Sequence, residues 1–239
     1  MRKVKFRLFF WGAMAGILII GSTGCTKAVS TSSNSANSYT YVSMMNLAPY
    51  SPSTVLYLNG AAATSAIAAG SVSQNYGSIT PGNYAVNFET STDSVLAQLA
   101  SAAYDSASFY SLVLYNTPVT HTSQAVRITD DFSGISSSNS NFRFFHMSPD
   151  LGAVDLYLNG TLTQAARTSA DIVSSSALTA FQQVTANTYS IQVMKSGTDT
   201  VIATIRKSLT PGNAYTIFLS GSSNVSSDTV TLNILEASY

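Results

Sequence analysis

The chain has 239 residues and a formal net charge of zero, and only 9% of its residues are charged. Charge this sparse argues against a nucleic-acid partner, because neutralising phosphates requires clustered Lys and Arg. It also argues against electrostatic docking on anionic lipid. Cys25 is the only cysteine, so no disulfide forms within the chain and its cores must rest on apolar packing.

The N-terminus has the three-part order of a secretory signal peptide, which we predict over residues 1–24. Four basic residues lie within the first seven positions, and Leu8–Ile20 is an uncharged apolar run that ends shortly before Cys25. Thirteen helical residues reach only about 20 Å, short of the roughly 30 Å hydrocarbon core, so the run is too short for a permanent span. Without this segment the chain has seven basic and eleven acidic residues, a net charge near −4.

The lone cysteine at the cleavage point resembles that of a bacterial lipoprotein, where it is lipidated and becomes the mature N-terminus. Gly24 and Cys25 fit that class, whereas Ser22 stands where Leu is usual. Ordinary cleavage after Gly24, leaving a free thiol, is the alternative. We expect lipidation at Cys25, and outer-membrane placement because Thr26 replaces the Asp that signals inner-membrane retention. The face of the membrane is left open.

The rest of the chain contains a flexible tether and an internal duplication. Residues 25–38 are rich in Ser, Thr and Asn and have no apolar periodicity, which predicts the tether. Leu56–Gly60 recurs as Leu156–Gly160, and further matching blocks follow in the same order at offsets of 100 to 106. The duplication predicts a first domain over 39–132, a linker over 133–140 and a second domain over 141–239.

Each repeat has the pattern of an all-β domain. Tyr84, Val86 and Phe88 alternate with polar or small residues, as in a half-buried strand. Asn59-Gly60 and Asn159-Gly160 each close such a run and favour type I′ turns. About seven short strands per repeat predict two tandem immunoglobulin-like β-sandwiches. Two Ala-rich or polar stretches, 61–70 and 164–176, fit either a short helix or a loose edge.

Two tyrosines at equivalent places are expected to hold the fold. Tyr110 and Tyr215 open corresponding late strands just after a loop or turn. A tyrosine at this place in a sandwich often buries its ring and bonds its hydroxyl to upstream backbone, the tyrosine corner. We predict such a bond in both repeats.

The second repeat opens with RFFHMSPD over residues 143–150, and VDLYLNG follows over residues 154–160. This string resembles a bacterial extracytoplasmic family known as domain of unknown function 4397, whose members run R-x-x-H-x-S-P-D…V-D-V-Y-x-x-G. In the first repeat Asn46, Tyr50 and Val55 replace the His and the two Asp. The resemblance implies an exported β-sandwich module that is often duplicated. It implies no known activity.

His146, Asp150 and Asp155 form the candidate site. A His four residues before an Asp is compatible with metal binding or acid–base chemistry. The alternative is structural, because Ser-Pro-Asp after a strand is turn chemistry that a strand-end His can tie down. We favour the structural role, since the first repeat replaces His146 and Asp150 while keeping its strand pattern.

Asp130 and Asp131, where the first repeat ends, are weaker candidates for a Ca²⁺ site between tandem sandwiches. We expect them to lie in a solvated turn, and we expect neither metal nor cofactor. His121 follows Pro118 in a polar loop and is expected to be exposed.

The motifs G-x-S-x-G, H-E-x-x-H and C-x-x-C do not occur, and no catalytic residue is predicted. We therefore predict a non-enzymatic binding or scaffolding module, held to the membrane through Cys25, with another envelope protein or a glycan as partner. One alternative is an envelope hydrolase or metal-dependent enzyme centred on His146 and Asp150. Another is a glycan-binding protein that presents Tyr39, Tyr41 and Tyr50.

Overall fold

β-strands form nearly all of the regular structure in the computed structural model, which describes residues 38–239 apart from Ser175. The first repeat contains β1 (Thr40–Leu47), β2 (Thr54–Leu58), β3 (Ala61–Ala62), β4 (Ser71–Val72), β5 (Gly77–Ile79), β6 (Gly82–Thr90), β7 (Val95–Tyr104), β8 (Phe109–Asn116) and β9 (Ser123–Asp130). The second contains β10 (Ser140–His146), β11 (Val154–Leu158), β12 (Thr161–Arg167), α1 (Asp171–Ser174), a 3₁₀ turn (Ser176–Leu178), β13 (Gln182–Val184), β14 (Asn187–Lys195), β15 (Val201–Leu209), β16 (Ala214–Ser220) and β17 (Thr231–Glu236).

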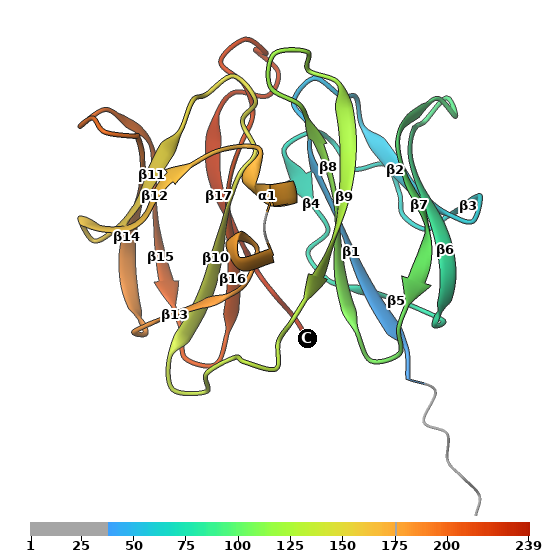
Figure 1. The fold of residues 1–239 in the computed structure, drawn as a ribbon, viewed down its shortest axis with the longest axis horizontal. Helices are drawn as coiled ribbons and strands as arrows, with labels where there is room; N and C mark the ends of the chain where they lie inside the picture. The colour runs from blue at the N-terminus through green and yellow to red at the C-terminus, as the bar shows by residue number, and fades with distance from the viewer. Residues whose placement is uncertain (1–37, 175) are drawn as a thin grey trace, which may run out of the picture. The chain divides into compact units, whose positions relative to one another are not determined.

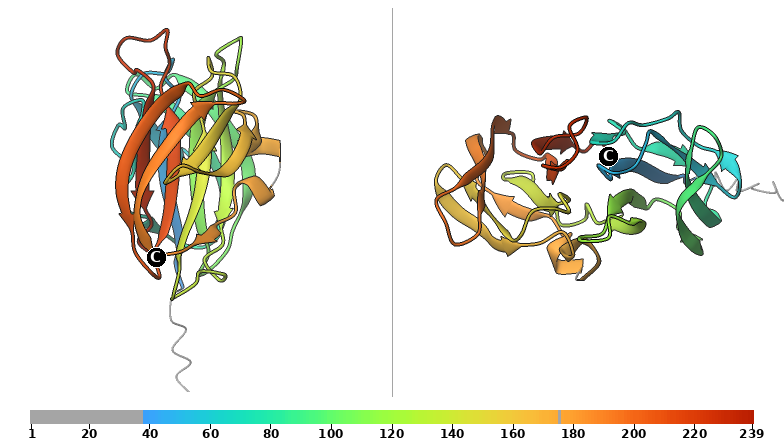
Figure 2. Two further views of the ribbon diagram at one scale, coloured as in Figure 1. Left: turned by 90° about the vertical axis from the view of Figure 1, so that its left-hand side faces the viewer. Right: turned by 90° about the horizontal axis from the view of Figure 1, so that it is seen from above.

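Each repeat is a sandwich of two sheets (Figures 1 and 2). In the first repeat the sheet β4-β1-β8-β9, with β5 also on β1, faces the sheet β3-β2-β6-β7. In the second, β13-β10-β16-β17 faces β12-β11-β14-β15. In both repeats the first strand pairs in parallel with the late strand, β1 with β8 and β10 with β16. The predicted tandem all-β sandwiches are confirmed.

The internal duplication is visible strand by strand. Eight strands correspond in order: β1, β2, β3, β5, β6, β7, β8 and β9 match β10, β11, β12, β13, β14, β15, β16 and β17. The alternation predicted at Tyr84, Val86 and Phe88 holds on β6, where Val86 and Phe88 are buried and Tyr84 is half-buried. The equivalent strand β14 shows the same pattern, with every second side chain from Tyr189 to Val193 buried. The predicted type I′ turns are also present, with φ of 49° and 80° at Asn59 and Gly60 and 50° and 79° at Asn159 and Gly160.

Residues 61–70 and 164–176, which the sequence allowed to be either a short helix or a loose edge, have different structures. Residues 61–70 form a loose edge that includes β3 and a single bridge from Thr54 to Ile67. Their counterpart in the second repeat continues β12 to Arg167 and then forms the one-turn helix α1. No helix within the described residues is long and apolar enough to cross a membrane. The predicted signal peptide, Cys25 and nearly all of the predicted tether lie outside the described residues.

Three apolar clusters hold the described unit together. One fills the first sandwich and one the second, and each draws its members from a single repeat. The third, which we call the shared core, joins the repeats; its buried members are Met45, Leu47, Val113, Tyr115, Ile128, Phe145, Met147, Ile172 and Phe218. The strands β1 and β10 therefore carry apolar side chains on both faces.

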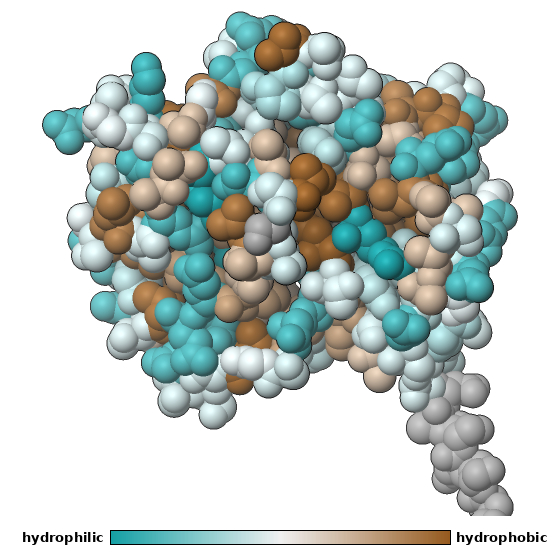
Figure 3. All heavy atoms as spheres, in the orientation of Figure 1, coloured by the Kyte–Doolittle hydropathy of each residue, from teal (hydrophilic) through white to brown (hydrophobic). Residues whose placement is uncertain are grey.

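The shared core reaches the surface beside β9. Apolar side chains gather between β9 and α1 on the face shown in Figure 3. A hollow of about 430 Å³ lies here, and its lining includes Val126, Ile128, Ile172 and Val173. The junction of the repeats thus presents a hollow with a mixed lining, in which these four apolar residues lie beside Arg127 and four Ser and Thr residues.

Both predicted tyrosine corners are present. Tyr215 is 1% exposed, and its hydroxyl accepts a hydrogen bond from the backbone N–H of Thr210 at 3.1 Å. The Tyr110 hydroxyl likewise accepts from the N–H of Asp105 at 3.2 Å, five residues upstream as in the second repeat. The two rings join the backbone before the late strand to the core of each sandwich.

Substitutions at Tyr215 separate its hydrogen bond from its packing. Tyr215→Phe removes one net hydrogen bond and is expected to lower the free energy of unfolding by about 1 kcal/mol. Tyr215→Ala removes a buried ring and is expected to cost about 3–5 kcal/mol. Denaturant unfolding measures both changes. Equal and negligible losses would contradict a structural role for this ring.

Candidate functional site

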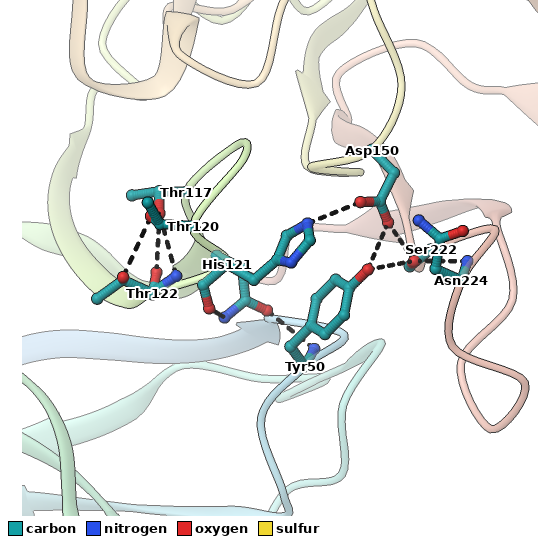
Figure 4. Close-up of polar contacts among 9 residues, drawn as sticks. Tyr50, Thr117, Thr120, His121, Thr122, Asp150, Ser222 and Asn224 are labelled. Atoms are coloured by element: carbon teal, nitrogen blue, oxygen red, sulfur yellow. Dashed lines mark hydrogen bonds and ion pairs between the residues drawn. The ribbon is translucent and has the colours of Figure 1, made fainter.

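Four side chains meet at one end of the repeat junction, and we call them the junction cluster: Tyr50, His121, Asp150 and Ser222 (Figure 4). Asp150 lies at the centre. Its Oδ2 accepts hydrogen bonds from the Tyr50 hydroxyl at 3.0 Å and from the Ser222 hydroxyl. Its Oδ1 lies 2.8 Å from His121 Nε2, which therefore donates because an ionised carboxylate only accepts. Both carboxylate oxygens are thus engaged within the chain.

The members of the junction cluster come from corresponding turns of the two repeats. Tyr50 and Asp150 follow β1 and β10 one hundred residues apart, and His121 and Ser222 lie in the loops after β8 and β16. Equivalent positions therefore touch each other, as expected where two like units pack around an approximate two-fold axis. The Tyr50 and His121 rings also stack, with centroids 3.9 Å apart and planes 10° from parallel.

The loop that carries His121 is held in a strained shape. Thr120 N–H bonds the Pro118 carbonyl at 2.8 Å, which closes a γ-turn on Val119 with a φ of 70°. A positive φ at a β-branched residue is a rare and costly conformation. His121 also has a positive φ of 53°, and buried Asn116 fixes it by donating to its carbonyl at 3.0 Å. The loop therefore presents the imidazole to Asp150 in one fixed orientation.

The order of contacts in the junction cluster favours a structural bond over nucleophilic catalysis. An activated serine requires a base next to its hydroxyl, with a third group orienting that base. Here Asp150 lies between His121 and Ser222, and the described contacts join each of them to the carboxylate and not to the other. Burial acts to raise the pKa of Asp150, but the bonds from Ser222, Tyr50 and His121 outweigh it and lower that pKa.

A second polar group crosses the junction through a buried ion pair. Arg143 Nη1 on β10 lies 2.5 Å from Asp130 Oδ1 at the end of β9, and the two side chains are 2% and 0% exposed. The other carboxylate oxygen accepts from the hydroxyls of Ser111 and Tyr76, each at 2.7 Å. Burial and then the nearby Asp130 charge raise the pKa of the Tyr76 hydroxyl.

His146 ties down a turn, and its counterpart in the first repeat does the same. His146 Nε2 lies 3.0 Å from the Gly152 carbonyl, and its Nδ1 lies 3.4 Å from the N–H of Ser148. Asn46 makes the matching pair of bonds, to the Pro52 carbonyl at 3.3 Å and from the N–H of Ala48 at 3.4 Å. The Asn46 amide and the His146 imidazole thus offer one donor and one acceptor to the same two places in the turn. Because the two side chains make the same bonds, the role of this position is structural.

Asp155 supports an irregular stretch of sheet. Its Oδ1 accepts from the N–H of Ala166 at 2.7 Å, where β12 shifts register and φ is 51°. Its Oδ2 accepts from the N–H of Gly197 in the hairpin between β14 and β15 at 3.2 Å. The bond to Ala166 lowers the pKa of Asp155 despite its burial. This carboxylate therefore stays ionised and holds two turns.

The structure does not bring the predicted residues together as one site. His146 and Asp150 share no hydrogen bond within the described residues, and Asp150 pairs with His121 instead. The expectation that His121 is exposed is met only in part, at 31% of its side chain, because Tyr50 stacks on its ring and Asp150 bonds its Nε2. The expectation of a solvated turn is wrong for Asp130, because the second repeat packs Arg143 against it.

Asp131 remains on the surface, where hydrogen bonds from Ser133 lower its pKa. The described residues contain no group of three or more His, Cys, Asp or Glu side chains placed to hold a metal ion. Of the tyrosines considered for glycans, Tyr39 is 46% exposed. Tyr41 stacks on Phe109 and Tyr50 on His121, so one face of each of those rings is already covered.

Sequence reasoning missed Tyr50, His121, Ser222 and Arg143 as junction residues. The 100-residue offset of the repeat was the available signal, because it makes Tyr50 the counterpart of Asp150. If the repeats pack face to face, these two counterparts meet as a hydrogen-bond donor and an acceptor. Arg143 carried a second signal, since a lone charge within the apolar run Phe142–Phe145 needs a buried partner.

These features define a class of tandem β-sandwich proteins whose two domains are fused through a common core. The family model described as a domain of unknown function (DUF4397) matches residues 40–157 and again residues 140–237. The chain belongs to this family and contains two copies of the domain. No match was found among curated proteins.

The turn role of His146 predicts which substitution the chain tolerates. His146→Asn introduces the residue of the first repeat and is expected to keep the free energy of unfolding within about 1 kcal/mol at pH 7.5. His146→Leu leaves the Ser148 N–H and the Gly152 carbonyl unpaired and is expected to cost about 1–3 kcal/mol. Denaturant unfolding compares the variants. A larger loss for Asn than for Leu would contradict this role.

The stabilities of wild type and His146→Asn are expected to depend differently on pH, and the sign of the difference follows from the pKa of His146. Burial lowers the pKa of His146, so the unfolded chain takes up a proton near pH 6.5 that the native state refuses. The wild type therefore has its full stability above that pH and loses part of it as the pH falls toward 5. His146→Asn cannot take up this proton, so it should lose less stability than wild type between about pH 6.5 and pH 5. Any contribution from His121 is the same in both proteins and does not affect the difference between them.

Asp150→Asn tests the junction cluster. The lowered pKa means that the carboxylate stabilises the fold above its unfolded pKa of about 3.9, and that this stability is lost as the pH falls below that value. Replacing its charge-assisted bonds is expected to cost about 1.5–3 kcal/mol at pH 7 and less near pH 3. Asp199→Asn, in the exposed hairpin after β14, is the control. Equal unfolding free energies at pH 7 for wild type, Asp150→Asn and Asp199→Asn would contradict a stabilising role of the junction cluster.

Proposed function

We propose that this protein is a lipid-anchored module of the bacterial envelope that acts by binding or scaffolding and not by catalysis. One observation carries the proposal: the acidic and imidazole side chains that the sequence singles out in the folded part hold turns and the repeat junction. Asp150 has both oxygens engaged, His146 bonds Gly152, and Asp130 is closed into an ion pair with Arg143.

The anchor is supported by the N-terminal sequence. A basic stretch, a short apolar run and small residues precede Cys25, and Ser, Thr and Asn dominate the residues from there to the start of β1 at Thr40. A lipid on Cys25 would hold the sandwiches near the membrane through this stretch, and outer-membrane placement is part of the proposal.

A binding or scaffolding role is supported by the way the repeats are joined. The shared core and the Arg143–Asp130 pair couple the sandwiches, so that the loops of both repeats present one surface. The hollow beside β9, with its mixed apolar and polar lining, offers a partner a contact area (Figure 3). We propose another envelope protein or a glycan as that partner.

The anchor is tested by Cys25→Ser. Wild type is expected in the detergent phase after phase partitioning of membranes, and Cys25→Ser in the aqueous phase, because one thioether-linked lipid is lost. Thr26→Ser, which leaves the cysteine in place, is the control and should partition like wild type. An aqueous wild type with an unmodified cysteine would show that the anchor is wrong.

The non-enzymatic part is tested by the turn-preserving variant. His146→Asn keeps the turn and removes the imidazole. If the protein binds or scaffolds, this variant should complement a strain that lacks the gene as well as wild type does. Failure of a stably folded His146→Asn protein would instead support chemistry at His146.

A further inference from the structure

The first sandwich contains a cavity that opens at the edge of its inner sheet. Its volume is about 250 Å³, and it lies at the edge of β1 that does not pair with β8, where β4 and β5 pair with that edge one after the other. Between these two short strands the Met44 carbonyl accepts a hydrogen bond from the Ser73 N–H at 2.8 Å, and the cavity opens beside it among the exposed residues Ala63, Asn75 and Ser78. The opening leads from the surface to the apolar interior of the sandwich.

The floor of the cavity is built from core residues. Val42, Met44 and Leu56 line it, and they are 7%, 1% and 1% exposed. Ile79, half-buried on β5, completes the apolar wall. An apolar ligand gains free energy when its own apolar surface leaves water for such a floor.

The second repeat fills the equivalent place with larger side chains. The registers Val42–Tyr110 and Phe142–Tyr215 show that Val42 corresponds to Phe142, and Met44 corresponds in the same way to Phe144. Both phenylalanines are fully buried in the second core. The first repeat thus has two smaller residues where the second has two aromatic rings.

The two repeats also close the equivalent carbonyl differently, since the backbone N–H of Ser73 bonds Met44 in the first repeat and a large side chain bonds Phe144 in the second. Arg167 Nη2 bonds the carbonyl of Phe144 at 3.0 Å, and its guanidinium lies 5.7 Å from the Phe144 ring. The registers Val154–Arg167 and Thr54–Ile67 show that the counterpart of Arg167 is Ile67, which packs into the first core instead. Residues 61–70 add mainly small side chains. The cavity is therefore a feature of one repeat and not of the common fold.

The rim of the cavity carries neutral polar groups. Thr64, Ser73, Asn75 and Ser78 line it, and no charged residue does. Within the described residues the side chains of Ser73, Asn75 and Ser78 form no hydrogen bond, so their hydroxyl and amide groups are available to a ligand. Burying a charged head here without a partner is costly, whereas a neutral hydroxyl or amide head finds donors and acceptors.

We propose that this cavity binds a small uncharged amphiphile, with its apolar body on Val42, Met44 and Leu56 and its neutral polar head at the rim. The volume exceeds the roughly 150 Å³ of an apolar cavity that holds benzene and falls just short of the roughly 300 Å³ at which drug-sized pockets begin. The site shares no residue with the junction cluster and does not depend on a lipid at Cys25.

The methionines report on binding directly. In the full chain carrying Cys25→Ser and ¹³C-methyl methionine, n-octanol should shift the Met44 methyl resonance saturably. Met45 is an internal control, since it points from the same strand into the shared core, and Met147 is another. Sodium octanoate, with the same chain and a charged head, should bind at least about tenfold more weakly. An unshifted Met44 methyl up to the solubility limit of octanol would overturn the site, and equal binding of octanoate would overturn the neutral head.

Filling the cavity supplies the matched variants. Val42→Phe introduces the residue of the second repeat, keeps the Met44 reporter and should abolish its response to octanol. Ala63→Leu, at the exposed mouth, should weaken the response by about tenfold without touching the core, whereas Ala62→Leu, its neighbour on β3, should leave it unchanged. An undiminished response in folded Ala63→Leu and Val42→Phe proteins would show that octanol binds elsewhere.

Discussion

The inner sheets of the two repeats are buried on both faces, and the rest of the structure depends on this constraint. Within one sandwich an inner strand needs apolar residues only at alternate positions, since its other face would meet water. β1, β10 and β16 break that rule because their outward side chains form the shared core. A single repeat would expose Met45, Phe145 and Phe218. The two domains therefore complete each other, although each has a core of its own.

Duplication followed by divergence explains why equivalent positions have different chemistry. Around an approximate two-fold axis, a residue near the axis meets its own counterpart, so two identical Asp residues at the place of Tyr50 and Asp150 would repel each other. Tyrosine in the first repeat turns this into a donor–acceptor pair. Away from the axis such pressure is absent, and Asn46 and His146 keep one task with different side chains. Val42 and Phe142 neither meet at the axis nor keep a common bonding task. The smaller Val42 leaves space for the cavity in the first sandwich.

Local patterns were sufficient to predict the fold, and contacts between the repeats were not. Alternation along β14, Asn-Gly turns and the tyrosine corners act within one repeat and are encoded over a few residues. The continuous apolar run at β10 carried no period, because both of its faces are buried. The partners of Asp150 and Asp130 lie up to 100 residues away and depend on how the repeats pack, so the sequence showed a His and an Asp four apart but not that Asp150 faces His121.

The polar contacts at the junction are best understood as devices of orientation. Apolar surfaces such as the shared core adhere without fixing their relative rotation, since the hydrophobic effect is non-directional. A buried ion pair adds little net stability once desolvation is counted, but it strongly penalises any arrangement that separates its charges. Arg143–Asp130 and the junction cluster act at separate places along the interface, and two such bonds define one relative orientation of the sandwiches. A module that binds or scaffolds requires this property, because its loops must keep one arrangement toward a partner.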